Sequence, residues 1–308
     1  MFNAIDLVYS SSVFNHGSDH AEPANNFIDF ITSWNFLHIN NINGVVSLCF
    51  VGIIVLIYFS GIIKLYKKAF FSKTKLFSLT TAVILLVFVL EGPIDYFAEE
   101  MFFIHMIQHL SLMVVIAPLL LLSNAMPVFI WGTPKLIRVL ISKPLAGKSK
   151  LKLFLSIITK PKYSLVLYIV NLYFWHIPYF YNLTLEYDAF HFINHLLFVF
   201  MALLLWWPII GPAPVRTNLS LPQRILYLLI AVTPSAALAA FITLSDGPLY
   251  AYEATPLHWN MLSHSEDQTW GGLIMWLPGN FLFLGVLTGL FFKWANQEES
   301  SALPKVEN

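Results

Sequence analysis

The sequence is short of charge and almost without cysteine. Only 11% of its 308 residues are charged while 57% are hydrophobic, and the mean hydropathy is +0.70. A soluble domain carries about 25% charged residues, so this composition indicates a membrane protein. The single cysteine, Cys49, lies in an apolar stretch and excludes a disulfide framework or a Cys-x-x-Cys metal clasp. No basic start followed by an apolar run precedes His38, so we expect no cleavable signal peptide.

The familiar catalytic motifs are also missing. A zinc protease of the His-Glu-x-x-His type needs a Glu directly after its first histidine. In the two His-x-x-x-His pairs of this chain, Met106 and Phe192 stand at that position, and neither can transfer a proton. The sequence has no Gly-x-Ser-x-Gly elbow and no glycine-rich phosphate loop. We therefore assign no catalytic residue and expect a binding or transfer protein rather than an enzyme.

Long apolar segments are abundant. A helix that spans a membrane needs about 20 mostly apolar residues. We predict an all-α polytopic membrane bundle of about seven transmembrane helices, in one domain over 43–293, between an extracytoplasmic segment 1–42 and a cytoplasmic tail 294–308. The seven predicted spans are 43–63, 76–95, 101–123, 163–183, 189–209, 222–244 and 269–292.

Positive charge is confined to one side of this arrangement. All seventeen Lys and Arg residues fall in the odd-numbered loops or follow the last helix. Basic loops are cytoplasmic as a rule, so we expect the N-terminus outside and the C-terminus inside. All ten histidines fall toward the opposite, acidic side. In the basic third loop, Thr133-Pro134 followed by an amphipathic stretch predicts a helix lying in the membrane interface.

Two histidine pairs open the third and fifth predicted spans. His105 and His109 share with His191 and His195 the pattern His, bulky apolar, Ile, amide, His, Leu. Residues four apart lie on one helix face, about 6 Å apart along the axis. Both helices enter from the outer side, so both pairs reach a similar depth, and His176 at the end of the fourth span reaches the same level. We predict one four-nitrogen metal site or two adjacent two-nitrogen sites.

Sulfur and amide groups lie near these imidazoles in the sequence. Met101 and Met113 continue the four-residue spacing of the first pair, with Met106 alongside. Thioether and imidazole together favour Cu(I) over Mg²⁺ or Ca²⁺, but imidazole also suits zinc and iron. Asp267 and Gln268 could hydrogen-bond a ligating imidazole or cap the last helix. The Gly271-Gly272 pair that follows predicts close helix packing.

At these residues the chain resembles bacterial cytochrome c oxidase assembly factors of the CtaG type, from about Leu76 to the end of the last span. It departs from the usual pattern at Asn194, where relatives often carry an acid, and at Gly247. The stretch around Asp95 adds an auxiliary candidate for the metal site. The matching stretches are Glu91-Gly92-Pro93-Ile94-Asp95, His105 to His109, Trp175-His176-Ile177-Pro178, His191 to His195, Trp206-Trp207-Pro208 with Gly211-Pro212, Ser245-Asp246 with Pro248-Leu249-Tyr250, and Asp267-Gln268 with Gly271 to Trp276.

The resemblance implies a protein of the bacterial plasma membrane with its metal site toward the extracytoplasmic face. Such a protein helps to form an active oxidase by supplying copper to it. The implied partners are oxidase subunits, other copper chaperones and the lipid bilayer, and nucleic acid is not among them.

Two other hypotheses stay open. Histidines on two parallel helices could ligate haem iron from both sides, which makes haem binding or transfer an alternative. A membrane metalloenzyme or a metal transporter is the other. A transporter needs polar groups that continue inward, whereas the residues below His109 and His195 are mostly apolar apart from Ser111.

Overall fold

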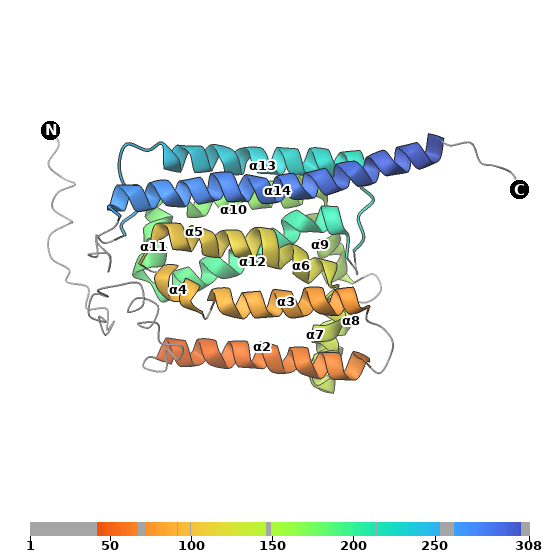
Figure 1. The fold of residues 1–308 in the computed structure, drawn as a ribbon. Helices are drawn as coiled ribbons and strands as arrows, with labels where there is room; N and C mark the ends of the chain where they lie inside the picture. Colours follow the sequence, from red (N-terminus) through yellow and green to blue (C-terminus); the bar gives the residue numbers. More distant parts are fainter. Residues whose placement is uncertain are drawn as a thin grey trace, which may run out of the picture.

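The computed structural model describes residues 42–66, 72–90, 92–98, 100–145, 149–212, 215–252 and 262–302. Within these ranges every regular element is a helix, and the long helices lie side by side in one bundle (Figure 1). The all-α prediction is confirmed for this part of the chain. The predicted N-terminal segment 1–42 lies outside the described residues except for its last position.

The bundle is built from long helices joined by short ones at its two ends (Figure 1). The helices of the first half of the chain are α2 (Ile42–Tyr66), α3 (Lys73–Leu90), α4 (Pro93–Ala98), α5 (Phe102–Leu110), the π-helical turn η1 (Ser111–Ile116), α6 (Ala117–Leu122), α7 (Met126–Gly132) and α8 (Lys135–Leu145). Those of the second half are α9 (Lys150–Ile158), α10 (Pro161–Trp175), α11 (Pro178–Glu186), α12 (Asp188–Ile210), α13 (Leu221–Thr243) and α14 (His264–Ala302).

Several helices have the length and composition of membrane spans. Five qualify within the described residues, and a sixth is formed if α9 and α10, which meet at a 73° bend, count as one span. The membrane-protein prediction is confirmed, while the count of seven and the direction of insertion stay predictions. The five are Lys73–Leu90, Phe102–Leu122, Ala189–Ile210, Leu221–Thr243 and His264–Ser301.

The fourth predicted span differs from the observed helices. We expected one helix over 163–183, but α10 ends at Trp175 and α11 begins at Pro178. Proline has no N–H to donate and forces the preceding residue out of the helical region. Ile177 accordingly adopts φ −67° and ψ 124°, and the chain turns at His176. The break places His176 at the end of a helix, where its ring can turn inward.

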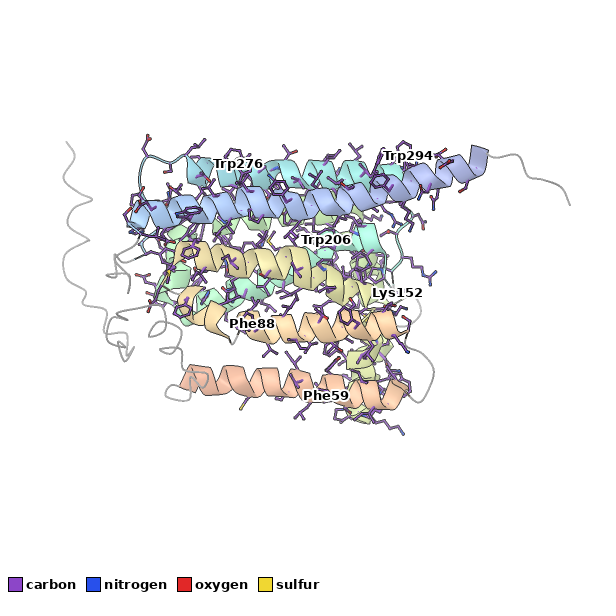
Figure 2. All side chains as sticks on the ribbon, viewed as in Figure 1. Phe59, Phe88, Lys152, Trp206, Trp276 and Trp294 are labelled. Atoms are coloured by element: carbon purple, nitrogen blue, oxygen red, sulfur yellow. The ribbon has the colours of Figure 1, made fainter. Side chains whose placement is uncertain are left out.

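A continuous column of α5, η1 and α6 lies at the centre of the bundle. It packs against α14, α12 and α3, while α2 lies at the edge and packs mainly against α7 (Figure 1). Trp206 is buried beside this column, and its indole N–H donates to the Met113 carbonyl in η1 at 2.7 Å. Outward-facing apolar side chains such as Phe59 and Phe88 are about half exposed (Figure 2), as lipid-facing residues are in a bilayer.

Two glycines allow α14 to approach its neighbours. A Cβ at Gly271 would overlap the Phe102 ring of α5, and a Cβ at Gly272 would lie 2.8 Å from the backbone nitrogen of Thr243 in α13. Real Cβ atoms essentially never come that close. The predicted role of this pair in close helix packing is confirmed, and it brings α14 directly against the histidine-bearing helix α5.

Charge is distributed between the two ends of the bundle. α3 and α9 begin with lysines at the end where Lys152 lies (Figure 2). α5 and α12 begin at the other end, beside α4 and α11 (Figure 1). The described basic residues and the described histidines are therefore well separated. The helix predicted after Thr133-Pro134 is present as α8, with none of its residues buried.

Candidate metal centre

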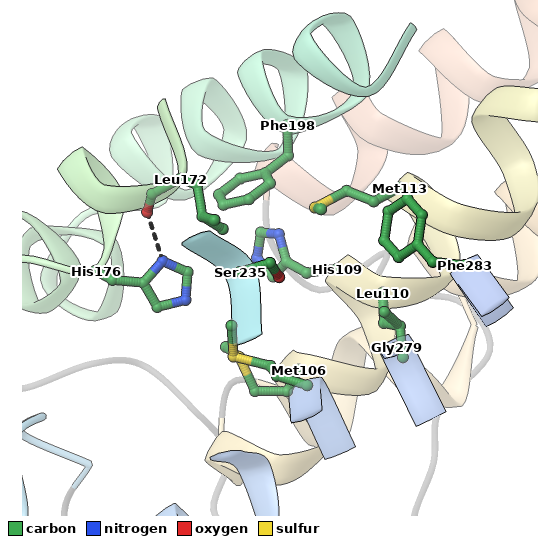
Figure 3. A pocket seen from close by; sticks show the side chains of 11 residues that line it. Met106, His109, Leu110, Met113, Leu172, His176, Phe198, Ser235, Gly279 and Phe283 are labelled. Carbon is green, nitrogen blue, oxygen red and sulfur yellow. Dashed lines mark hydrogen bonds between the residues drawn. The ribbon is translucent and has the colours of Figure 1, made fainter. Parts of the chain in front are cut away.

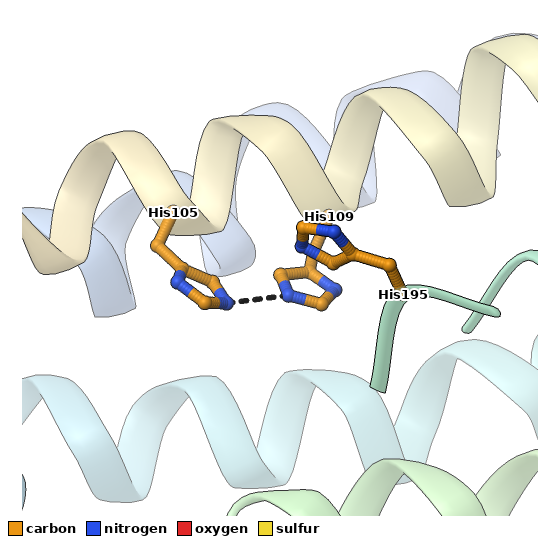
Figure 4. Close-up of side chains that lie close together, drawn as sticks. All are labelled: His105, His109 and His195. Atoms are coloured by element: carbon orange, nitrogen blue, oxygen red, sulfur yellow. Dashed lines mark hydrogen bonds between the residues drawn. The ribbon is translucent and has the colours of Figure 1, made fainter. Parts of the chain in front are cut away.

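Three imidazoles from two helices converge in the interior of the bundle. One ligand nitrogen each from His105, His109 and His195 lies within 4.8 Å of the other two (Figure 4). The side chains of His105, His109 and His195 are only 1%, 6% and 9% exposed. The Nε2 atoms of His105 and His109 are 2.5 Å apart. We call these three residues the histidine cluster.

His191 lies at the rim of the histidine cluster. Its ring centroid is 5.4 Å from that of His105 and 4.3 Å from that of His195. Unlike the other three, His191 is only partly buried. The structure thus brings the two predicted pairs together, with three rings inside and the fourth at the surface of the group.

A tyrosine fixes the orientation of the His105 ring. The Tyr252 hydroxyl donates to the Ala98 carbonyl at 3.4 Å and lies 3.2 Å from His105 Nδ1 and 2.7 Å from the Tyr181 hydroxyl. That hydroxyl has one proton, and when it points to the Ala98 carbonyl, His105 Nδ1–H donates to the hydroxyl oxygen. The lone pair of a neutral His105 is then on Nε2, which faces His109 and the rest of the cluster. A bond of this kind to the distal nitrogen is the usual way in which proteins orient a metal-binding imidazole.

The first turn of α5 is held by a carboxylate from α14. Asp267 accepts hydrogen bonds from the backbone N–H groups of Phe102 at 2.8 Å and Phe103 at 3.0 Å. These donors have no partner within their own helix, and a carboxylate also interacts favourably with the positive end of the helix dipole. Asp267 therefore caps α5 at Phe102, three residues before His105.

Other polar residues near the site connect elements of the bundle. Gln108 donates to Asp95 Oδ1 at 2.6 Å and to the Val89 carbonyl at 3.0 Å, which ties α5 to α4 and α3. Gln268 accepts from the Leu249 N–H at 2.6 Å and donates to the Gly247 carbonyl at 3.1 Å. The auxiliary candidates Asp95 and Gln268 thus make contacts with backbone and amide groups that position helices and a loop.

His176 and two of the candidate methionines lie on another side of His109. His176 is buried, and the Phe198 ring lies near both histidines, with its centroid 6.3 Å from that of His176 and 4.3 Å from that of His109. Met106 and Met113 line a small cavity together with His109 and His176 (Figure 3). Met101 precedes α5 and is not among the residues that line this cavity.

Tyr250 supports the turn that presents His176. Its hydroxyl donates to the His176 carbonyl at 3.3 Å, and its ring stacks on Phe102 with centroids 4.9 Å apart. Burial raises the pKa of the Tyr250 hydroxyl well above its usual value, so the group remains a hydrogen-bond donor. Tyr250 and Tyr252 were not recognised from the sequence as part of the site, although Tyr250 falls in a stretch that carries the family resemblance.

The histidine cluster has the chemistry of a small metal site. His109 Nδ1 and His195 Nε2 are buried without a hydrogen-bond partner among the described residues. Buried polar groups are normally paired, so unpaired nitrogens call for an explanation. Ligands about 2.0–2.1 Å from one ion are at most about 4.2 Å apart, so the rings need only small movements to share an ion. The cluster can therefore hold one ion through two or three nitrogens.

Comparison with known proteins places the chain in a family. A family model described as cytochrome c oxidase caa3 assembly factor matches residues 56–297. The chain belongs to this family. The matched range includes the histidine cluster, His176 and His191.

Relatives of this chain occur in mycobacteria. Two proteins described as uncharacterized, from Mycobacterium bovis and Mycobacterium tuberculosis, are each 28% identical over 239 residues, or 74% of this chain. The match covers 35% of each relative, so the chain spans about a third of their length. No solved structure matches the chain.

Proposed function

We propose that this assembly factor binds Cu(I) at the histidine cluster and delivers it to cytochrome c oxidase. The observation that carries the proposal is the convergence of three buried imidazole nitrogens within 4.8 Å on helices α5 and α12. Polar groups inside membrane helices are costly, so such a group is a functional site by default. The copper ion is cargo, and the chain acts by binding and transfer rather than by catalysis.

Two considerations favour copper over other metals. One is the type of donor atoms near the site, and the other is that a transferred ion must be able to leave its ligands. Imidazole binds copper, zinc and iron, whereas the neighbouring thioethers of Met106 and Met113 favour Cu(I). Imidazole and thioether shells exchange more easily than a thiolate cage does. Partners that follow from this proposal are the copper-receiving oxidase subunits and other copper chaperones.

Haem binding is less compatible with the packing. The Phe198 ring lies 4.3 Å from His109, and the Tyr181 ring lies 5.5 Å from His105, between centroids. A porphyrin would have to displace these rings to reach the imidazoles. The visible spectrum of the freshly purified protein tests this alternative, because haem gives a strong Soret band and Cu(I) gives none.

The first experiment measures copper binding by the purified full chain. Anaerobic titration with Cu(I) against a chromophoric chelator should give at least one tightly bound ion per chain. The His105→Ala/His109→Ala double variant should bind at least 100-fold more weakly, which corresponds to about 2.7 kcal/mol. The proposal is wrong if the double variant binds copper as tightly as the wild type.

A matched control comes from a histidine at the same end of the bundle. His264 Nε2 contacts the Tyr250 carbonyl at 2.9 Å and lies outside the histidine cluster. His264→Gln should bind Cu(I) with unchanged affinity. In bacteria that lack the endogenous gene, the wild type and the control should restore oxidase activity and oxidase-bound copper, while the double variant should restore neither.

We further propose that the chain crosses the bacterial plasma membrane seven times and that the histidine cluster faces the extracytoplasmic side. The single cysteine allows a direct test. In a Cys49→Ser background, a cysteine at Ser265 should react with a membrane-impermeant maleimide in intact spheroplasts. A cysteine at Ser142 in α8 should react only after lysis. The reverse labelling pattern would overturn the orientation.

A further inference from the structure

The cavity beside the histidine cluster is lined by His109 of the cluster and by four donors from outside it. It has a volume of about 30 Å³, and three thioethers and two imidazoles line it: those of Met106, Met113, Met275, His109 and His176 (Figure 3). One water-sized occupant needs at least about 10–15 Å³ on this scale. The cavity therefore has room for a single ion with soft donors around it.

His176 presents a lone pair to this cavity. Its Nδ1 lies 2.7 Å from the Leu172 carbonyl, which can only accept, so Nδ1 carries the proton. The lone pair is then on Nε2, which is buried and without a hydrogen-bond partner among the described residues. A bond from one ring nitrogen to a backbone carbonyl is the usual support for a metal-binding imidazole.

His109 presents a second lone pair to the cavity by the same reasoning. In the tautomer in which His105 Nδ1–H donates to the Tyr252 hydroxyl, His105 Nε2 is an acceptor. The contact between the two Nε2 atoms then requires His109 Nε2 to be the donor. The lone pair of His109 is left on Nδ1, which is also buried and without a hydrogen-bond partner among the described residues.

The backbone geometry fixes one of the sulfur donors. Met113 lies in the π-helical turn η1, and its carbonyl accepts from Trp206. Single π-helical turns inside α-helices occur frequently at functional sites. Met275 comes from α14, between Gly271 and Gly279, the two glycines that contact α5.

We propose that this cavity is a second Cu(I) position, built from Met106, Met113, Met275 and His176, and that His109 belongs to both positions. This inference rests on the proposed copper function. A neutral imidazole has one lone pair, so His109 serves one ion at a time. When Cu(I) leaves the histidine cluster for the cavity, the proton of His109 moves from Nδ1 to Nε2, and no electron is transferred. The two positions are therefore stages in the movement of one ion.

X-ray absorption at the copper edge distinguishes the two positions because sulfur and nitrogen scatter differently. The full-length wild type loaded with one and then two equivalents of Cu(I) should show sulfur in the copper shell. The Met106→Leu/Met113→Leu/Met275→Leu variant should show nitrogen alone, and an ion in the cavity should bind at least 10-fold more weakly than in the wild type. A Met126→Leu/Met201→Leu control, which changes methionines outside the cavity, should keep the wild-type spectrum.

Leucine and methionine are similar in volume, so each exchange should cost less than about 1.5 kcal/mol of stability. If the triple variant does not fold, the single Met275→Leu variant should still show reduced sulfur scattering. A nitrogen-only shell in the wild type at both loadings, or unchanged sulfur in the triple variant, would overturn the second position and leave the proposed function standing. A wild type that binds no Cu(I) would overturn both.

Discussion

The two histidine pairs have nearly the same local sequence but different surroundings. In α5, both His105 and His109 are buried, because the helix packs against α14 and α4 and its imidazoles face rings of α12. In α12, His195 is buried while His191 is only partly so, and its neighbours Phe192 and Ile193 are exposed. A spacing of four residues aligns two imidazoles on a helix, but neighbouring helices decide which of them is inside.

The largest expected effect is on Cu(I) affinity, and it distinguishes the two histidines of α12. His195→Gln should weaken Cu(I) binding about 30-fold, near 2 kcal/mol, because it removes a buried donor. His191→Gln should weaken it less than 5-fold, since this ring lies at the rim. Competition titration with a Cu(I) chelator measures both. Equal losses would show that burial does not distinguish the two residues.

The next effect concerns the packing of α14 against α5. Gly271→Ala forces a Cβ into the Phe102 ring, and overpacking of this kind costs about 1–3 kcal/mol. Gly285→Ala, on the same helix with nothing within 4 Å of the added Cβ, should leave stability unchanged or raise it. Thermal unfolding in detergent compares the pair. If both variants melt alike, close packing at Gly271 is unimportant.

Removing the cap of α5 should destabilise the protein somewhat less than overpacking at Gly271. Asp267→Asn removes the charge and one of the two oxygen acceptors, so we expect a loss of about 1–2 kcal/mol and weaker Cu(I) binding. Glu266→Gln is the control, because Glu266 is exposed and its carboxylate accepts from Ser263 rather than from the first turn of α5. Unfolding temperature and copper affinity should both fall for Asp267→Asn alone. A normal melting temperature with normal affinity would contradict the role of this cap.

The smallest effect should come from the hydroxyl that orients His105. Tyr252→Phe keeps the ring but removes the acceptor of the Nδ1–H bond, which is worth about 0.5–1.5 kcal/mol. Copper affinity should therefore fall up to about 10-fold, while the exposed Tyr179→Phe control stays at the wild-type value. Tighter binding by Tyr252→Phe would mean that this bond opposes the ligating tautomer.

Much of the helical architecture could be predicted from hydropathy, since a lipid-facing helix needs a long apolar run. The break at His176 was missed, although Pro178 is a sufficient reason for it. The length of α14 was also missed, because polar residues after Lys293 continue the helix to Ala302. In both cases local backbone chemistry, rather than hydropathy, sets the end of the helix.

The spacing of His105, His109 and His195 predicted their approach to one another, but not that His176 lies outside this group and lines a cavity beside His109. Nor does helical spacing show that Met113 lies in a π-helical turn. Met275 was overlooked even though Gly271, Met275 and Gly279 are four residues apart and share one face of α14. Small residues at that spacing mark the face of α14 that contacts α5, and this signal could have identified Met275 as a residue near the site.

The donor groups of the histidine cluster and of the cavity differ in their sensitivity to oxidation. The only thiol of the chain, Cys49, is exposed on α2 and is not part of either donor group. Oxidants that convert thiols to disulfides would leave imidazole nitrogens intact, whereas stronger oxidation turns methionine into its sulfoxide. Oxidative damage would then impair the cavity first and leave the histidine cluster able to capture metal.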